Sequence, residues 1–389
     1  METEASFPTP PGTRWQAEPF RIFFPLGVVF GWIGIGHWLL YATGTTSTYS
    51  CSFHALIQMQ AFMMAFAVGF LLTAVPRRTQ GRPPSPLELL AVAGSLTTVV
   101  GAALTGHQAL QQLAYAALFL LLLQFAVRRF IGSEAGRRPP AAFVLIPIGV
   151  LHGLGGAALI AAASFTSVHA STLALSRLAV EQGVFLCFAV GVGSLVLPLM
   201  NGLPPPPDLD ASPRERWRLL AYAAAGITIF ASLAMEAGGW DRAGPMLRAA
   251  VLVLTLGPRA GRRPGKPGLH RRLVWIAVWL MPFGLAASAI WPDYRVPALH
   301  VLFIGGFSLL AFGVATHVVL GHLDLTGLAL GRPPALVFLG TMIILAMLAR
   351  LTADWSDTYF EHLGWASGAW LLASAAWLAF LGPKLLRRS

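Results

Sequence analysis

The chain has 389 residues, of which 56% are hydrophobic and only 11% are charged. A soluble domain carries roughly 25% charged residues, so this composition excludes a soluble globular protein and a disordered chain. The formal net charge of +11 could suggest nucleic acid, but the basic residues cluster between apolar runs, as in the loops of membrane proteins. Cys51 and Cys187 are the two cysteines, which excludes a disulfide framework or a zinc site built from cysteine pairs.

Long uncharged stretches predict membrane-spanning helices, because a hydrocarbon core about 30 Å thick takes roughly 20 helical residues. Polar turns at 43–48 and 105–108 divide longer apolar runs, and the prolines at 204–207 must lie in a loop. The span at 243–257 is short and contains Arg248. The sequence thus predicts an all-α polytopic membrane protein with about twelve transmembrane helices, near 22–43, 54–76, two within 89–127, 141–163, a sixth that follows the polar loop 164–172 and continues through Gln182 to Pro198, then 219–237, 243–257, 272–291, 297–320, 333–351 and 362–382.

The distribution of Lys and Arg predicts the orientation of these spans, because basic residues resist translocation. With the N-terminus inside, 22 of the 27 basic residues fall in inner segments, which predicts that both termini are cytoplasmic. We expect a cytoplasmic segment over 1–21, a single transmembrane domain over 22–383 and a basic cytoplasmic tail over 384–389. No basic region precedes an apolar core within 1–21, so we expect no cleavable signal peptide.

Histidines at membrane depth are the strongest candidates for chemistry, since an ionisable side chain is costly there and needs a partner. His37, His54 and His300 fall at one level near the outer ends of their spans, and His152 lies at mid-depth. Neutral imidazole suits both haem and copper, so these four are candidate cofactor ligands. The alternative for each is a hydrogen-bonded packing role, which we favour for His37 and His152 taken singly but not for His54 and His300.

A second pair of candidate metal ligands lies toward the inner ends of the spans. His317 follows His300 by 17 positions, roughly 25 Å along a helix, so these two cannot bind one metal. His317 and His322 are five positions apart, which does not place them on one helical face. A joint site requires the helix to end between them, as Gly321 would permit. We expect the other histidines to be solvated loop residues: His107, His169, His270 and His362.

Several further side chains each have two interpretations. Arg248 could neutralise a haem propionate, or extend its side chain to the membrane interface. Arg177 and Glu181 are four positions apart and form either a simple pair or part of a proton path. Met59 and Met63 lie one helical turn apart; thioethers bind copper(I), although a methionine stripe is usually core.

Motifs of several enzyme classes are missing from the sequence. It has no phosphate-binding loop, no HExxH and no CxxC or CxxCH motif, so nucleotide hydrolysis, zinc proteolysis and covalent haem attachment have no support. It has no adjacent histidine pair, unlike the main subunit of haem-copper oxidases. Nothing in the sequence establishes catalytic turnover, so whether the protein is an enzyme stays open.

Two regions of the sequence resemble the NnrS family of membrane proteins. The first comprises PFRIFF at 19–24, His54-Ala55 and GFLLTAVP at 69–76. The second comprises ALH at 298–300 and LGH at 320–322. The resemblance implies a haem- and copper-containing bacterial inner-membrane protein associated with denitrification and tolerance of nitric oxide.

The resemblance also implies candidate ligands. His54 matches the first histidine of the family's His-Ala-His-Glu pattern, and His300 and His322 match its histidines in the tenth span. His152 is similar to a histidine in the fifth span.

This sequence departs from the family's pattern at several positions. Leu56 and Ile57 stand where the pattern has His and Glu. The neighbourhood of Trp279 lacks the family's histidine in span nine, and Leu195 stands where many members have Arg. These departures leave three alternatives: haem without copper, different ligands such as His37 or His317, or loss of the metal.

We therefore expect an inner-membrane protein that holds haem b, with or without copper, and binds or responds to nitric oxide, protecting against nitrosative stress. Its expected partners are the lipid bilayer, a diatomic gas and a redox protein, but no nucleic acid. One alternative is a cofactor-free secondary transporter, in which Pro147, Gly155 and Gly156 mark broken helices. Another is a copper-handling or assembly protein that uses the His and Met residues of the second span.

Overall fold

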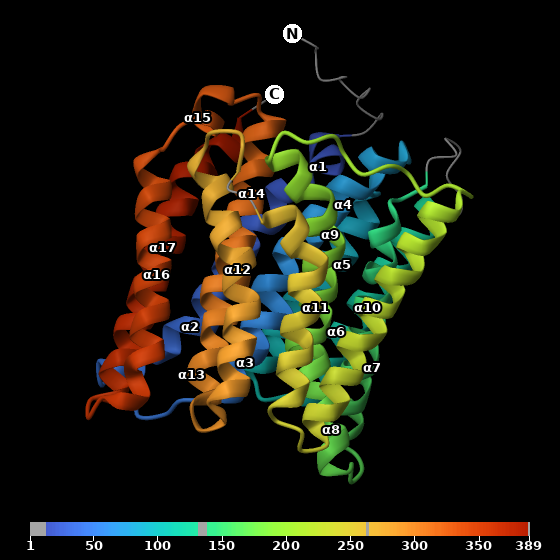
Figure 1. Cartoon of the computed structure of the whole chain (residues 1–389). Helices are drawn as coiled ribbons and strands as arrows, with labels where there is room; N and C mark the ends of the chain where they lie inside the picture. Colours follow the sequence, from blue (N-terminus) through green and yellow to red (C-terminus); the bar gives the residue numbers. More distant parts are fainter. Residues whose placement is uncertain (1–12, 131–137, 262–263, 388–389) are drawn as a thin grey trace.

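The structure, a computed structural model, describes residues 13–130, 138–261 and 264–387 as a bundle of helices without strands (Figure 1). The predicted inner residues Arg137, Arg262, Arg263 and Arg388 lie outside these ranges. In the described part, eleven helical stretches are long and apolar enough to cross a membrane. The all-α polytopic architecture predicted from the sequence is therefore confirmed.

Most of these stretches run without interruption through the apolar layer. Their bounds are α2 (Phe20–Ala42), α5 (Pro86–Leu104), α6 (Gln108–Phe130), α7 (Leu145–Ala162, after the 3₁₀ turn η2, Ala141–Val144), α10 (Pro213–Ala237), α12 (Leu269–Ile290), α16 (Pro334–Thr352, before the 3₁₀ turn η6, Ala353–Trp355) and α17 (Tyr359–Leu386).

Three other stretches each contain a π-helical segment, in which the backbone hydrogen bonds reach one residue further than in an α-helix. The first is α3 (Cys51–Ile57), η1 (Gln58–Met63) and α4 (Met64–Thr79); the second is α8 (Ala170–Leu178), η3 (Ala179–Gly183) and α9 (Val184–Met200); the third is η4 (Pro292–Tyr294), α13 (Arg295–His300), η5 (Val301–Ser308) and α14 (Leu309–His322).

A further helix, α11 (Ala243–Ala260), is less apolar than the eleven because it carries Arg248 and Arg259. It nevertheless lies along the bundle between α10 and α12 and packs against both (Figure 1). It corresponds to the short span predicted at 243–257.

The helix boundaries differ from the sequence prediction at two places. The sixth span begins at Ala170, slightly inside the polar loop expected over 164–172, because the His169 ring accepts a hydrogen bond from the Ser171 backbone N–H and caps the helix. Helix α7 is continuous through Gly155 and Gly156, and Pro147 lies in its first turn, where proline is tolerated. The broken helix expected for a transporter is therefore not found in α7.

The bundle has two distinct ends. The terminal end, at the top of Figure 1, holds α1 (Arg14–Ala17), α15 (Thr326–Leu330) and the last turn of α17. The far end holds the loops 43–50, 163–169 and 238–242. At the terminal end the Arg14 guanidinium donates to the Leu385 carbonyl at 2.5 Å, which joins the two ends of the described chain.

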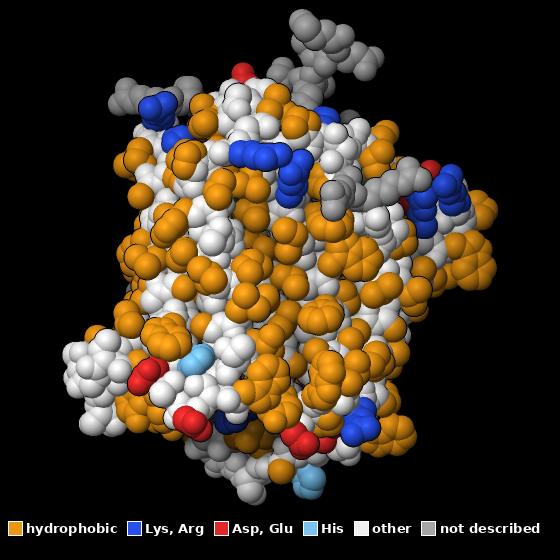
Figure 2. All heavy atoms as spheres, turned by 60° about the vertical axis from the view of Figure 1, so that its left-hand side comes forward, with side chains coloured by type: hydrophobic (Ala, Val, Ile, Leu, Met, Phe, Trp, Pro, Cys, Tyr) orange, Lys and Arg blue, Asp and Glu red, His pale blue; other side chains and the backbone are white. Residues whose placement is uncertain are grey.

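Basic side chains gather at the terminal end. Figure 2 shows a broad hydrophobic belt over one face, with most of its Lys and Arg side chains along the upper edge. On this face the basic side chains of the described residues thus gather mainly at one end of the bundle, as in membrane proteins. The cytoplasmic location of that end stays a prediction.

Candidate functional site

A cavity of about 310 Å³ lies in the half of the bundle nearer the far end, and we call it the histidine cavity. Side chains from α2, α3, η1, α8, η3, α13, η5, α16 and α17 line it, and most of its surface is apolar. All three π-helical segments contribute to its wall, for example through Met59, Glu181 and Phe303. A π-helical segment turns the side chains that follow it relative to a regular helix, and such segments are frequent at functional sites.

His54 and His300 face each other in this cavity. Their rings are nearly parallel, at an interplanar angle of 10°, with centroids 6.4 Å apart. His54 Nδ1 lies 3.0 Å from the Gly34 carbonyl oxygen, and His300 Nδ1 lies 2.8 Å from that of Val296. A carbonyl oxygen accepts, so each Nδ1 carries the proton and each Nε2 keeps a free lone pair. This is the arrangement in which imidazole binds a metal through Nε2.

His37 lies beside this pair, as the sequence analysis expected. Its ring centroid is 6.0 Å from that of His54, and its Nδ1 lies 3.1 Å from the same Gly34 carbonyl oxygen that His54 uses. Its ring also packs on Trp38 and Phe53. His37 is not part of the cavity lining, so its position suits support of His54 rather than contact with a bound group.

Two arginines, Arg295 of α13 and Arg350 of α16, line the cavity. Arg350 Nη1 lies 3.1 Å from an Asp354 carboxylate oxygen, and Arg295 pairs with Glu236 of α10. Each of the two arginines therefore lines the cavity and is paired with a carboxylate near the far end.

Arg248 lies neither at the membrane interface nor at the histidine cavity, the two positions that the sequence-based interpretations implied. It is fully buried, pairs with the same Glu236 and is absent from the cavity lining. It therefore neither extends to the interface nor reaches the histidine cavity. Its connection to that cavity runs through Glu236 to Arg295.

Glu181 borders the histidine cavity on one side and a second, polar cavity on the other. The polar cavity, about 280 Å³, lies toward the far end, and its wall includes Ser50, Gln108 and Arg177. No ion pair joins Arg177 to Glu181, although both belong to the described residues, so the simple pair expected from their spacing does not form.

His152 lies away from these residues. It is buried in α7, with its Nδ1 3.9 Å from the Cys187 sulfur and its ring stacked on Phe230 at 5.6 Å. It does not line the histidine cavity. The structure therefore does not bring His152 together with His54 and His300, and its contacts are those of a packing residue.

A second histidine group lies near the terminal end. His270 Nε2 and His317 Nδ1 are 3.2 Å apart, so these two nitrogens share a hydrogen bond. His270 is buried at the start of α12, which corrects the expectation of a solvated loop residue. Helix α14 continues to His322 without ending at Gly321, contrary to the requirement for a joint site of His317 and His322.

His322 makes contacts of its own within this group. Its Nδ1 lies 2.8 Å from the Val318 carbonyl oxygen, and its ring packs edge-on against Phe20. Over the described ranges, no group of three or more His, Cys, Asp or Glu side chains is arranged to hold a metal ion.

Met59 and Met63, which the sequence offered as copper ligands or ordinary core, line the histidine cavity beside His54. Sequence reasoning missed two other features of the site. Glu236, the shared partner of Arg248 and Arg295, was not singled out, because it lies at the very end of the predicted span 219–237, where a charged residue is unremarkable. The three π-helical segments could not be recognised, because their residue types (QMQAFM, AVEQG and VLFIGGFS) are equally compatible with a regular α-helix.

A bundle of long apolar helices around a cavity at membrane depth defines an α-helical multi-pass membrane protein. Comparison with protein families matches residues 14–389 to the NnrS protein family, so the chain belongs to the NnrS family. At the level of the family this associates the chain with nitric oxide. No curated protein matches the sequence.

Proposed function

We propose that this protein binds a b-type haem in the histidine cavity, where His54 and His300 would hold it, and binds nitric oxide there. In this proposal it resides in the cytoplasmic membrane of a bacterium and protects the cell against nitrosative stress. The observation that carries the proposal is the facing pair of imidazoles, each with its Nδ1 occupied by a backbone carbonyl and its Nε2 free.

The spacing of the two rings fits a single metal ion between them. Two imidazole nitrogens at about 2.0–2.1 Å from one metal place the ring centroids roughly 6 Å apart, and the observed separation is 6.4 Å. Two protein ligands suffice for haem, because the porphyrin supplies the other four nitrogens. The apolar wall, with Phe62, Phe303 and Trp370, suits the body of such a group.

The two arginines at the cavity wall suit its charged edge. Haem carries two propionates, and guanidinium groups recognise carboxylates with paired hydrogen bonds. Arg295 and Arg350 fill this role in the proposal in place of Arg248, which is not at the cavity.

When bound, the haem would supply an iron that takes up a diatomic gas in place of one of its two histidine ligands. His54 and His300 hold the group and set its orientation, while the backbone carbonyls of Gly34 and Val296 fix the imidazole tautomers. The apolar wall keeps water from the site. A redox partner and turnover of the gas are further expectations that this arrangement permits.

The test is a dithionite-reduced minus oxidised visible spectrum of the detergent-purified protein, with iron and copper analysis of the same sample. We expect a b-type spectrum that shifts when nitric oxide is added. His54→Ala and His300→Ala should each reduce the haem content several-fold, because each removes one of the two proposed ligands.

His107→Ala is the matched control, since His107 is exposed in a loop at the far end. It should keep the wild-type haem content. Folded protein without iron, from cells with adequate haem supply, would contradict the proposal. A full wild-type spectrum in both His54→Ala and His300→Ala would show that the ligands lie elsewhere.

One observation favours a second candidate function, copper handling. Met59 and Met63 line the same cavity as His54 and His300, so two thioethers and two imidazoles face one space. Copper retained without haem, and lost in a Met59→Leu/Met63→Leu variant, would favour this function over the first.

A further inference from the structure

A third cavity, entirely apolar, lies next to the histidine cavity. It has a volume of about 100 Å³, opens to the surface of the bundle on one side, and is lined by side chains of α2, η1, α4, α9, α12, η5 and α14. Every residue of its wall is Phe, Leu, Val, Met, Ala or Gly. We call it the apolar cavity.

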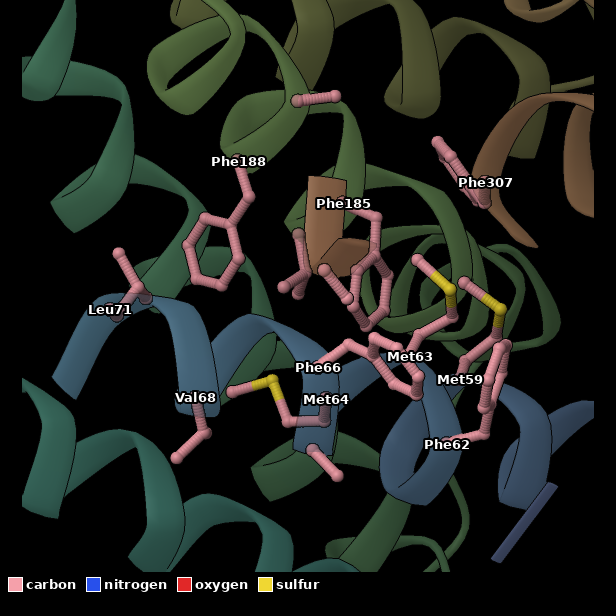
Figure 3. Packing of buried hydrophobic residues seen from close by; sticks show 14 of the residues in the cluster. Met59, Phe62, Met63, Met64, Phe66, Val68, Leu71, Phe185, Phe188 and Phe307 are labelled. Atoms are coloured by element: carbon pink, nitrogen blue, oxygen red, sulfur yellow. The ribbon is translucent and has the colours of Figure 1, made fainter. Parts of the chain in front are cut away.

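Met63 connects the two cavities. It is the one residue that lines both, and it belongs to η1, the π-helical segment that also carries Met59. Figure 3 shows Met63, Phe185 and Phe307 converging from three different elements, and the two phenyl rings are 6.0 Å apart. A methionine side chain has three flexible torsions, so Met63 can move aside more readily than a branched or aromatic side chain.

The size and lining of the apolar cavity select its guest. A cavity needs only about 10–15 Å³ to hold one water molecule, yet a purely apolar cavity of about 150 Å³ stays dry and binds xenon or benzene. Ions and strongly polar molecules are excluded because no group in the wall can replace their water. The lining therefore favours an uncharged, weakly hydrated guest, and the volume of about 100 Å³ favours a small one.

We propose that the apolar cavity is a binding site for a small uncharged diatomic gas, which passes from it to the histidine cavity beside Met63. This inference rests on the proposed function for the identity of the gas, nitric oxide. The binding site itself is independent of haem, because its wall shares only Met63 with the histidine cavity.

Xenon is the probe that tests the site without haem. We expect xenon to bind the purified protein, detected by xenon nuclear magnetic resonance. Ala67→Phe and Ala311→Phe should abolish binding, because both alanines line the apolar cavity and a phenyl ring is as large as the benzene that fills a cavity of about this size. Ala224→Phe, on the exposed side of α10, is the matched control and should keep it.

The connection is tested by nitric oxide association with the haem-loaded protein after flash photolysis. In Ala67→Phe and Ala311→Phe we expect an unchanged haem spectrum and an association rate lowered about tenfold or more, which corresponds to roughly 1.4 kcal/mol of added barrier. Ala224→Phe should associate at the wild-type rate.

The outcomes separate the two proposals. Xenon that binds wild type and all three variants equally would overturn the gas site. Loss of xenon with an unchanged association rate would overturn the connection through Met63. The wild-type protein could lack haem and still bind xenon, with the xenon lost only in Ala67→Phe and Ala311→Phe. That result would contradict the proposed function and support the gas site.

Discussion

Glu236 is the centre of a buried charged group next to the histidine cavity. Its carboxylate pairs with the fully buried Arg248 of α11 and with Arg295, which lines the cavity. One carboxylate facing two guanidinium groups leaves one net positive charge in this group. That charge lies at the edge of the cavity, where the proposal places an anionic propionate, so binding would complete the neutralisation.

Removing the Glu236 charge should destabilise the protein strongly. In Glu236→Gln the buried Arg248 loses its counter-charge, and breaking a buried pair from one side costs about 3–5 kcal/mol. We expect the free energy of unfolding in detergent to fall by that order. The measurement is a denaturant titration followed by tryptophan fluorescence.

The double variant Glu236→Gln/Arg248→Met is the informative control, because it removes both buried charges. It should recover most of the loss, whereas Glu361→Gln, at an exposed carboxylate, should change little. Equal stability of Glu236→Gln and wild type would contradict the importance of the buried pair.

Individual residues show where sequence reasoning succeeds and where it stops. It placed His37, His54 and His300 at one level, because helix length fixes depth along a span, and the structure brings their rings together. It misplaced His270, which sits among basic residues and looks exposed. The burial of His270 depends on how α12 packs against α14, and a single sequence does not contain that contact.

At the scale of elements, turns with polar residues were predictable and irregular helices were not. The turn at 105–108 separates α5 from α6 as predicted, because Gly106 adopts a positive φ of 75° that ends the helix. The π-helical segment η5 has the sequence VLFIGGFS and is apolar in every direction. Hydrophobic periodicity cannot reveal its altered hydrogen bonding, and so could not predict which side chains reach the cavity.

Helix α12 approaches η5 so closely that backbone meets backbone. A Cβ added at Gly284 would lie 2.6 Å from the Leu302 backbone nitrogen, which cannot move without shifting η5. Small residues allow such approaches between membrane helices. Since η5 supplies Phe303 to the histidine cavity, this contact also helps to set the cavity wall.

Gly284→Ala should therefore destabilise the protein by about 1–3 kcal/mol, the usual cost of overpacking. Gly94→Ala is the matched control, because a Cβ there has nothing within 4 Å. It should stabilise the protein by about 0.5–1 kcal/mol, since alanine is the better helix former. Denaturant titration measures the free energy of unfolding of both variants. A Gly284→Ala protein as stable as wild type would disprove the close contact.

At the scale of the whole molecule, the two ends of the bundle differ in charge and in the cavities near them. The basic side chains predicted to lie inside gather at the terminal end, while the histidine cavity and the polar cavity lie toward the far end. If the terminal end faces the cytoplasm, both cavities lie nearer the outer surface of the membrane. Orientation therefore decides from which side a redox partner would reach the cofactor.

The native cysteines allow a direct test of this orientation. Cys51 is exposed at the far end, whereas Cys187 is buried in α9 and shielded from a charged reagent. We expect a membrane-impermeant maleimide to label wild-type protein in intact spheroplasts, and Cys51→Ser to abolish the labelling. Thr326→Cys in the Cys51→Ser background puts the reactive thiol in α15 at the terminal end, where the residue is exposed. That variant should be labelled only after the membrane is broken, and the opposite pattern would place both termini outside and reverse the predicted topology.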